Sequence, residues 1–475
     1  MKNLLLILVI PFLILAQDID TFHLETINIY GMEIHNTESG KNITIISSSD
    51  INNYSFNSVD ELLKLIPSIE MQSRGGFGTQ SDIVLRGTTF NQTLVLLDGL
   101  RINDPLTGHF SMYLPISPYD IHQIEIIRGG GSSIYGPDAV GGVINIITKS
   151  FKDNYAKNEI IAESKIGQNN LKGANLYLAK NVNDKFFTTL SCNIIKSDGQ
   201  ELYNNIFSFF DNQKFTISHR YRPSERLSFM LRSAYSKNFF SSQYYYTRSD
   251  YDLSNELIDK RWTQFQVNYN VNDSSQVNFY SSYQSVNDFY IFNPAFPSYQ
   301  NYTELINSKI HYILNKKTMK LISGFDFQNR KITSIDRGDH KDYYIGGFIN
   351  VVQKIPATSL NVNPSLRFDY NKSYGFQINP QIDLNFNKNN YNIRASLGRT
   401  IRSADFTERF YNNNYADTLS PGRNIGNPNL NAEKSINCEL GFDLKRNKNL
   451  IFKNTMFYRS STNLIDWLLL SSEDI

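Results

Sequence analysis

The sequence predicts a mostly β protein, in which a transmembrane antiparallel β-barrel follows a smaller mixed α/β domain. Three observations lead to this prediction. From about residue 155 onward, apolar and polar residues alternate with a period of two. Short polar turns alternate with long loops, which is typical of barrels that cross membranes with strands. The mean hydropathy is −0.38, and no run of about 20 apolar residues occurs, so spanning helices are excluded.

Residues 1–16 are expected to be a secretory signal peptide. Lys2 precedes an apolar run at residues 4–16, and a polar stretch follows. The run is too short to span a membrane, and a charged start, a short apolar core and a small final residue characterise a cleaved export signal. Pro11 argues against a buried helix there. We therefore expect the chain to be exported.

The mixed domain is expected at residues 50–150, after a polar and flexible arm at residues 17–49. It begins with a helix at residues 58–67, because Ser58 and Glu61 have the spacing of a capping box. Strands are predicted at residues 82–85, 93–97, 121–128 and 143–149. Asp98 and Gly99 supply a tight hairpin turn after the second of these strands.

The predicted barrel covers residues 151–475. Alternation is clearest at residues 360–370, 376–386 and 436–444. A soluble sandwich also alternates, but its strands are usually about five or six residues long, whereas these run to about ten or more. Turns at residues 387–390 and 446–449 and loops at residues 238–260 and 408–431 complete the pattern. We count about sixteen strands at a spacing of about 20 residues.

Several motifs in the mixed domain occur together and in order. They are Leu85-Arg86-Gly87, residues 91–99, residues 101–105, residues 124–129, Ser133-Ile134-Tyr135-Gly136 and residues 139–149. This stretch resembles the plug domain of TonB-dependent outer-membrane receptors. Residues 394–411 and 426–435 resemble barrel segments of the same family. The resemblance implies a barrel of about 22 strands with the plug inside it.

Eight residues of the motifs are expected to shape the plug: Gly87, Asp98, Gly99, Gly129, Gly136, Gly141, Gly142 and Asn145. The glycines permit positive φ or close approach of the backbone, which a compact domain inside a barrel requires. A nucleotide-binding loop is the alternative reading of the glycines. It fails because Pro137 and Asp138 stand where Lys and Ser or Thr would bind phosphate and metal.

The resemblance implies that Arg86 and Arg128 face glutamates on the inner barrel wall and help to seat the plug. Glu439 matches one of those glutamates and lies on the inward face by alternation. Its usual companion belongs to a later strand, beyond residue 475. Such pairing is physically reasonable, because an enclosed charge needs an opposite partner to offset its desolvation. The alternative is that each arginine faces trapped water or an aspartate.

The position of the Ton box, between signal and plug, is occupied by Glu25, Thr26, Ile27, Asn28, Ile29, Tyr30 and Gly31. The resemblance implies that this segment binds the TonB–ExbB–ExbD complex. A Ton box works by adding an extended strand to the edge of a partner's sheet, so that main-chain hydrogen bonds matter more than side chains. A plain disordered arm is the alternative.

Candidate ligand contacts are the aromatic residues of the long loops: Tyr244, Tyr245, Tyr246, Phe292, Phe296, Tyr299 and Tyr302. Aromatic residues also form girdles at the membrane interfaces, which is the alternative use. The 7 histidines are scattered, and Cys192 and Cys438 lack the spacing of a metal site or a disulfide framework. No catalytic residues, metal or cofactor are therefore expected, and the chain is not expected to be an enzyme.

The resemblance implies active import of vitamin B12 or an iron–siderophore complex across the outer membrane by a monomer surrounded by lipid. A net charge of +2 without a basic tract excludes nucleic acid as a partner. A surface adhesin, a passive porin and a signal-transducing receptor are the alternatives. The last needs a folded domain before the plug, and residues 17–49 are fewer than the roughly 50 that a domain needs. The barrel is expected to be truncated at its C-terminal end, since about sixteen strands are fewer than the family's number.

Overall fold

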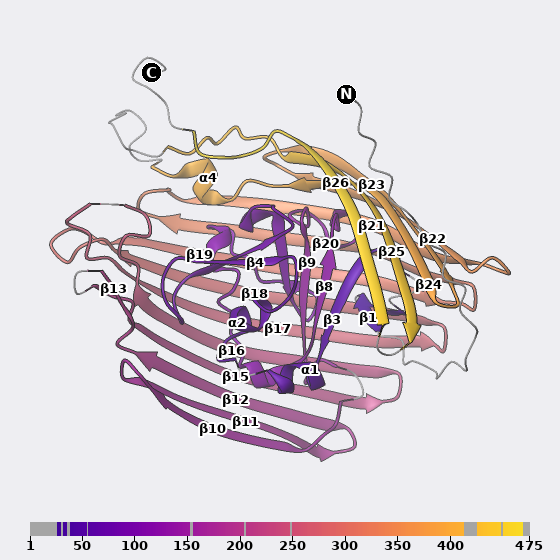
Figure 1. Ribbon diagram of the computed structural model, residues 1–475, viewed down its shortest axis with the longest axis horizontal. Coiled ribbons are helices and arrows are strands. Elements are labelled where there is room, and N and C mark those ends of the chain that lie inside the picture. The colour runs from indigo at the N-terminus through magenta and orange to yellow at the C-terminus, as the bar shows by residue number, and fades with distance from the viewer. Residues whose placement is uncertain are drawn as a thin grey trace, which may run out of the picture.

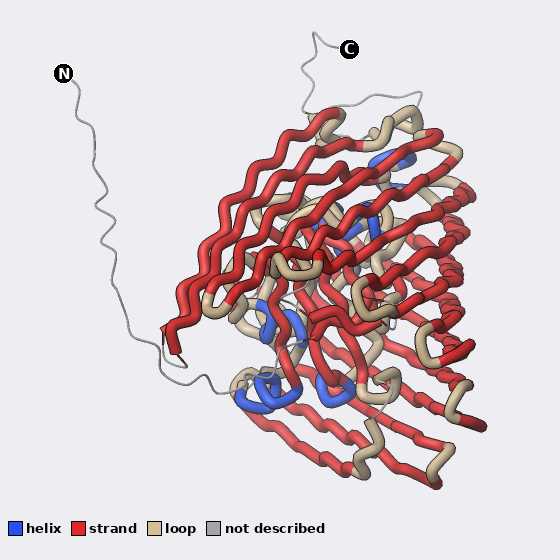
Figure 2. The backbone as a smooth tube through the Cα atoms, turned by 90° about the vertical axis from the view of Figure 1, so that its right-hand side faces the viewer, coloured by secondary structure: helices blue, strands red, loops and turns tan. Residues whose placement is uncertain are grey.

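The computed structural model describes residues 26–29, 32–35, 39–54, 56–152, 155–203, 206–247, 249–412, 425–447 and 450–468. Fifteen antiparallel strands form one curved sheet, and a smaller mixed domain lies inside the curve (Figures 1 and 2). This is the architecture that the sequence predicts, with one strand fewer than our estimate. The predicted signal peptide at residues 1–16 lies outside the described residues.

Each strand of the curved sheet pairs with the next one along the chain. The order is β10 (Glu159–Gly167), β11 (Leu171–Asn183), β12 (Phe186–Ser197), β15 (Phe210–Ser224), β16 (Leu227–Ser241), β17 (Asn255–Asn272), β18 (Ser275–Ile291), β19 (Tyr299–Asn315), β20 (Met319–Ser334), β21 (His340–Ile355), β22 (Leu360–Asn371), β23 (Gly375–Lys388), β24 (Tyr391–Arg402), β25 (Glu433–Asn447) and β26 (Leu450–Thr462). Within the described residues, β10 and β26 are the two edges of this sheet. A small hairpin, β13 (Glu201–Tyr203) and β14 (Ile206–Phe207), lies in the loop after β12.

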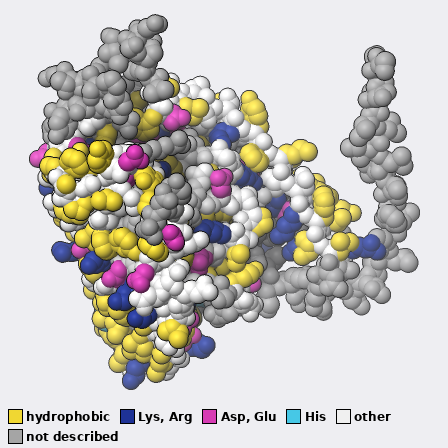
Figure 3. Space-filling model, turned by 60° about the vertical axis from the view of Figure 1, so that its left-hand side comes forward, with side chains coloured by type: hydrophobic (Ala, Val, Ile, Leu, Met, Phe, Trp, Pro, Cys, Tyr) yellow, Lys and Arg dark blue, Asp and Glu magenta, His cyan; other side chains and the backbone are white. Residues whose placement is uncertain are grey.

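The curved sheet has its polar face inside and its apolar face outside. In β22, Asn363, Arg367 and Asp369 are buried, whereas Phe368 and Tyr370 are 42% and 54% exposed. Hydrophobic side chains form several patches on the surface visible in Figure 3. A soluble sandwich would bury the apolar face instead, so this arrangement suits a sheet surrounded by hydrocarbon. Within the described part of the chain, no helix is long and apolar enough to cross a membrane.

Long and short connections alternate, as predicted. Residues 389–390 join β23 to β24, whereas residues 403–432 join β24 to β25 and include the short helix α4 (Phe406–Phe410). The long loop predicted at residues 238–260 is shorter in the structure. Phe239 and Phe240 pair with Leu257 and Glu256, so the ladder continues on both sides and the loop covers only residues 242–254.

The mixed domain is built on a five-stranded sheet. Its order is β3 (Asn42–Ser47), β8 (Ile121–Arg128), β9 (Gly142–Thr148), β6 (Thr93–Leu97) and β7 (Leu100–Arg101). Only β6 and β9 pair in parallel. A separate hairpin joins β4 (Ile69–Ser73) to β5 (Ser81–Leu85). The strands predicted at residues 82–85, 93–97, 121–128 and 143–149 are thereby confirmed, together with the turn at Asp98 and Gly99. Leu94, Val95 and Ile144 lie in the core with no exposed surface.

The ordered domain begins before residue 50, so the predicted boundary and the predicted flexibility of residues 39–47 are wrong. β3 pairs with β8 along its whole length. Helix α1 (Ser48–Asn53) follows at once, and Ser47 and Asp50 form its capping box. The candidate Ton box lies partly in β1 (Thr26–Ile29), which forms a hairpin with β2 (Met32–His35). Glu25, Tyr30 and Gly31 lie outside the described residues.

The first predicted helix is shorter than expected and is capped differently. Helix α2 (Val59–Leu63) buries Val59, Leu62 and Leu63, as its apolar pattern predicts. The side chain of Ser58, however, makes no capping hydrogen bond. Glu61 instead accepts a hydrogen bond of 2.7 Å from the backbone N–H of Asn57. Among the described residues, the remaining short helices are η2 (Phe90–Gln92), η3 (Gly108–Phe110), η4 (Pro118–Asp120) and α3 (Ser132–Tyr135).

Candidate functional site

The turn between β6 and β7 is tied to the inner wall by a buried ion pair. Asp98 adopts φ +48° in this turn, and its Oδ2 lies 2.5 Å from Nη1 of Arg232 on β16. The Arg232 side chain has no exposed surface. It also donates to Gln264 on the wall and to the hydroxyl of Thr148 in the mixed domain. Asp98 in turn accepts from the backbone N–H of Thr148 at 2.7 Å. Both charges are therefore enclosed and depend on each other.

Asn145 supports the same turn, and the predicted glycines allow unusual backbone conformations or close contacts in the mixed domain. Asn145 accepts from the N–H of Gly99 at 3.1 Å and donates to Glu125 at 2.9 Å. Positive φ occurs, as predicted, at Gly87, Gly99, Gly129 and Gly136. A Cβ on Gly141 would lie 2.9 Å from the carbonyl oxygen of Leu85, and one on Gly142 would lie 2.3 Å from that of Ile127. These two glycines permit the close approach of backbone that we expected.

Arg86 contacts Glu439, the wall residue that the sequence proposes as its partner. Nη1 of Arg86 lies 2.9 Å from Oε1 of Glu439, and each side chain is 6% exposed. The guanidinium also lies over the ring of Phe457 on β26, 4.7 Å from its centre. A buried pair of this kind is costly to break, because separation leaves either charge without a partner in a poorly hydrated space.

Gly129 makes room for that ion pair. Its φ is +81°, and a Cβ at this position would lie 1.5 Å from Oε1 of Glu439. No side chain is compatible with the observed place of the carboxylate. Gly129 is thus required twice, once by its backbone conformation and once by the approach of the wall.

Arg128 bonds within its own domain rather than to a wall glutamate as expected. It donates to the hydroxyl of Ser68 at 2.5 Å and to that of Thr44 at 2.7 Å. Burial and the like charge of Arg86 lower the pKa of Arg128 to about 10, and the nearby Glu439 opposes this shift. Among the described residues, the ion pair to Glu439 belongs to Arg86 alone. Thr44 can reach Arg128 because β3 lies beside β8.

Gly40 and Lys41, directly before β3, are held against the wall. Lys41 Nζ lies 3.5 Å from Asp383 on β23, and it donates to the carbonyl oxygen of Gly130 at 2.6 Å and to Ser396 on β24 at 3.1 Å. A Cβ on Gly40 would lie only 2.6 Å from the Cβ of Asp383. Lys41 therefore joins the start of the ordered domain to two wall strands.

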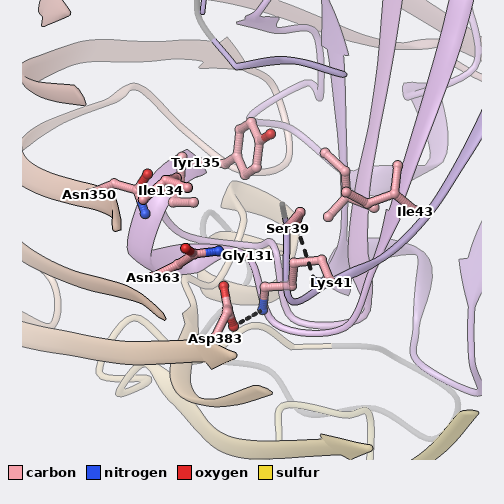
Figure 4. Close-up of a pocket in the computed structure, with 11 residues that line it drawn as sticks. Ser39, Lys41, Ile43, Gly131, Ile134, Tyr135, Asn350, Asn363 and Asp383 are labelled. Atoms are coloured by element: carbon pink, nitrogen blue, oxygen red, sulfur yellow. Dashed lines mark hydrogen bonds and ion pairs between the residues drawn. The ribbon is translucent and has the colours of Figure 1, made fainter. Parts of the chain in front are cut away.

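Figure 4 shows Lys41 and Asp383 at the edge of a small cavity between the mixed domain and the wall. The cavity has a volume of about 20 Å³ and is bordered by Tyr135 and by Asn350 on β21. A space of this size accommodates roughly one water molecule. The fit between domain and wall is therefore close at this level.

Further wall contacts involve residues that the sequence analysis did not select. Arg101 pairs with Asp138, and Asp138 accepts from the backbone N–H of Ser403 at 2.9 Å. Gln92 donates to Glu433 on β25 at 2.7 Å, and Glu433 also pairs with Arg402 at 2.9 Å. One sequence feature could have identified the wall residues that make these contacts: each is a charged residue on the polar face of an alternating strand. They are Arg232, Asp383, Arg402 and Glu433.

Asp104 shows how polar groups of the wall receive the mixed domain. Its carboxylate accepts from Gln284 on β18 at 3.1 Å and from Thr303 on β19 at 3.0 Å. Burial raises the pKa of Asp104, while the charge of Lys260 on β17 opposes the shift. The carboxylate is therefore enclosed between domain and wall.

The aromatic residues of the loop after β16 lie over the end of the mixed domain. The carbonyl oxygen of Tyr245 accepts from Arg74 at 2.9 Å, and Tyr246 donates to Gln80 at 2.8 Å. The ring of Tyr246 also lies 5.5 Å from that of Tyr290 on β18. These tyrosines lie at the end of the curved sheet that carries the long loops, which we call the mouth. A solute would first meet the inner domain at this end.

The other predicted aromatic contacts do not share one location. Tyr299 lies 6.5 Å from Tyr290 and thus joins the group at the mouth, whereas Phe292 and Phe296 contact each other in the next loop. Tyr244 is 42% exposed. Tyr302 faces outward, because its neighbours Asn301 and Thr303 on β19 are buried on the inner face. Its predicted role in binding a solute inside the mouth is therefore wrong.

A cavity of about 390 Å³ lies at the same end, between α4 and the ends of β21 and β22. His340, Lys341, Lys372 and Arg409 give it a basic lining, with Asp342 as the acidic residue. The ring of Phe410 stacks on His340 at 3.5 Å. The mouth therefore offers both aromatic and cationic surfaces.

No metal centre is evident in the described ranges, where His, Cys, Asp and Glu do not form a group of three suited to one. Cys192 and Cys438 are free and partly exposed.

Comparison with known families identifies both parts of this arrangement. The TonB-dependent Receptor Plug Domain matches residues 35–143, and the TonB dependent receptor-like beta-barrel matches residues 161–472. The chain belongs to the TonB-dependent receptor family. The mixed domain is its plug, the curved sheet is its barrel sheet, and members of this family are outer-membrane proteins. The plug match begins at residue 35, in agreement with the early start of the ordered domain.

Relatives and solved structures agree with this assignment. A protein of Vibrio vulnificus (strain YJ016) named vitamin B12 transporter BtuB is 38% identical over 135 residues, which are 28% of this chain and 22% of that relative. The matched part thus spans about a fifth of the relative's length. A mutant of the ferric enterobactin receptor PfeA of Pseudomonas aeruginosa has a TM-score of 0.72 at 15% identity, covering 88% of this chain and 71% of that one.

A second solved structure, the ferric yersiniabactin uptake receptor FyuA of Yersinia pestis, has a TM-score of 0.71 at 13% identity. The match covers 90% of this chain and 73% of that receptor. At these identities the two structures establish the shared fold.

Proposed function

We propose that this protein imports vitamin B12 or an iron–siderophore complex across the outer membrane, with energy supplied by the TonB–ExbB–ExbD complex. The partial likeness to a vitamin B12 transporter in sequence, and to siderophore receptors in fold, supports this cargo class. The aromatic and basic surfaces at the mouth are suited to a large, partly polar solute.

The observation that carries the proposal is the way in which the plug is seated. Three separate buried ion pairs join the plug to the wall: Asp98 to Arg232, Arg86 to Glu439 and Lys41 to Asp383. Removing one partner of a buried pair typically costs about 3–5 kcal/mol. Opening a path between the plug and the barrel wall would break several such contacts. Transport therefore requires an external source of energy. A passive porin or an adhesin has no need of this arrangement.

The segment at residues 25–31 is the proposed point of attachment for TonB. Thr26 to Ile29 already adopt the extended conformation that strand addition requires. The chain reaches the anchored Lys41 only a few residues after β2. A pull on β1 would therefore load the Lys41–Asp383 contact and the edge strand β3 first.

Growth of a deletion strain with vitamin B12 or chelated iron as the limiting nutrient tests two proposals together: import of that nutrient, and attachment of TonB at residues 25–31. The wild-type gene and the Ile27→Val variant are expected to restore growth on one of these nutrients. Ile27→Pro is expected to fail, because proline removes a backbone N–H from the added strand, while cargo binding at the mouth stays unchanged. Normal uptake by the deletion strain contradicts import of that nutrient. Restoration by Ile27→Pro contradicts the assigned Ton box but leaves import standing.

Binding at the mouth is expected to depend on Tyr246 and not on Tyr302. Replacing Tyr246 by Ala removes an aromatic surface next to the plug, and we expect the Kd of the imported solute to rise about tenfold. Tyr302→Ala is the matched control, since this tyrosine is on the outer face. Titration of each purified variant measures the effect. Equal Kd values for the Tyr246 variant and the wild type contradict a binding role for this residue.

A further inference from the structure

The outer face of the barrel sheet carries an apolar groove of about 700 Å³. Its floor is Gly347 on β21. Tyr344, Gly346 and Phe348 are buried on the inner face of this strand, so Gly347, between the last two, faces outward. The register pairs Gly347 with Phe325 on β20 and with Phe368 on β22. The groove is therefore flanked by two rings, of which Phe325 is 69% exposed.

The dimensions of this groove suit one hydrocarbon chain. Neighbouring strands lie about 4.8 Å apart, so the backbones of Phe325 and Phe368 are separated by about 10 Å, with Gly347 between them. A larger residue at Gly347 would occupy that space, since its Cβ would already lie 3.2 Å from the ring of Phe325. In a bilayer the groove would be filled by lipid rather than water.

One end of the groove reaches a cluster of lysines at the rim. Tyr370 and Phe376 line that end and are register partners, and Lys372 follows Tyr370 by two residues at the end of β22. On β21, Nζ of Lys341 lies 5.3 Å from the centre of the ring of Tyr343, which is exposed on the outer face. This rim is the one with the long loops.

The charges of the rim are unbalanced. Lys341 stands directly opposite Lys331 on β20, and like charges in register repel each other. Lys331 pairs with Glu304 at 3.0 Å and is also influenced by the exposed Asp339. Asp342 pairs with Arg409 at 3.5 Å, so within the described residues Lys341 and Lys372 form no ion pair. Both also border the mouth cavity. An anionic group at this height would relieve the repulsion.

We propose that this surface binds one phosphate-bearing lipid of the outer leaflet, with an acyl chain over Gly347 and its phosphate between Lys341 and Lys372. The outward residues of β21 from Lys341 to Gly347 span about 20 Å, which is close to the length of an extended acyl chain. The acyl-chain part of the site lies on the outer face, whereas Lys341 and Lys372 also border the mouth cavity and would be shared with the cargo surface.

Native mass spectrometry of the full chain, released from micelles that contain phosphatidylglycerol or phosphatidylcholine, tests the proposal. The wild type is expected to retain phosphatidylglycerol in preference to phosphatidylcholine. The double variant Lys341→Gln/Lys372→Gln is expected to retain about tenfold less phosphatidylglycerol, because each lysine near an anionic lipid surface contributes measurably to binding. Gly347→Phe is expected to lower retention by closing the groove.

The chain offers a matched control for each change. Lys172 and Lys196 are also exposed and are register partners on β11 and β12, away from the groove, so Lys172→Gln/Lys196→Gln should retain lipid like the wild type. Ala174→Phe adds an aromatic ring at an exposed position of β11 and should leave lipid retention unchanged. Equal loss in both lysine pairs reduces the effect to general surface charge and overturns the proposal. Equal retention of the two lipids by the wild type also overturns it.

Discussion

Replacing Arg232 by Met is expected to destabilise the seated plug by about 3–5 kcal/mol, the usual cost of leaving a buried charge without its partner. Asp98 would remain enclosed in the turn between β6 and β7, with only hydrogen bonds from Thr148 to stabilise it. Hydrogen exchange of the amides in β6 and β9 measures the effect. We expect their exchange to accelerate by about a hundredfold or more, since 1.4 kcal/mol corresponds to a factor of ten.

Two further variants identify the cause. Arg261→Met removes an exposed arginine from the neighbouring strand β17 and should change stability by no more than about 0.5 kcal/mol. Adding Asp98→Asn to Arg232→Met removes the unpaired charge, so the double variant should be more stable than Arg232→Met alone. If the double variant is less stable than Arg232→Met, the ion pair is not what seats this turn.

The elements of the plug could be predicted because their signals are local. Asp98 and Gly99 mark a turn by residue type, and residues 93–97 form a short apolar run between turn signals. Alternation likewise placed Glu439 on the inner face. Motif resemblance supplied Arg86 and Arg128 as candidate partners, and the side chain of Arg86 does meet Glu439.

The partners of other charges could not be predicted because they depend on how the plug is rotated within the sheet. Asp98 and Arg232 are separated by 134 positions, and alternation shows only that Arg232 faces inward. The assignment of Arg128 failed for a related reason. Asn42 to Ser47 form an edge strand with an irregular burial pattern, which looks like part of a polar arm in the sequence. Once β3 lies beside β8, Thr44 provides the acceptor that a wall glutamate was expected to provide.

The capping of α2 shows the same limit at short range. Ser58 and Glu61 have the spacing of a capping box, yet Glu61 accepts from the N–H of Asn57 instead. Spacing identifies which residues are available to satisfy the free N–H groups of a helix start. Which N–H is satisfied depends on the path of the preceding chain, and that path is set by the packing of the plug.

Replacing Gly129 by Ala is expected to break the contact between Arg86 and Glu439. The left-handed conformation costs an L-residue about 1–2 kcal/mol. The added Cβ would also occupy the place of the carboxylate, 1.5 Å from its present Oε1. Glu439 must then move away, which leaves Arg86 buried without its partner at a further cost of about 3–5 kcal/mol. The plug amides should therefore exchange faster than in the wild type by several orders of magnitude.

Gly87 provides the control that separates these two costs. Its φ is +65°, but a Cβ at this position would meet no atom within 4 Å. Gly87→Ala should therefore show only the conformational cost of about 1–2 kcal/mol. In a Glu439→Ala background the clash at Gly129 is absent, so Gly129→Ala should there cost no more than Gly87→Ala. If the two substitutions at 129 and 439 instead prove additive, the close approach of Glu439 is not what selects glycine, and the backbone conformation alone accounts for it.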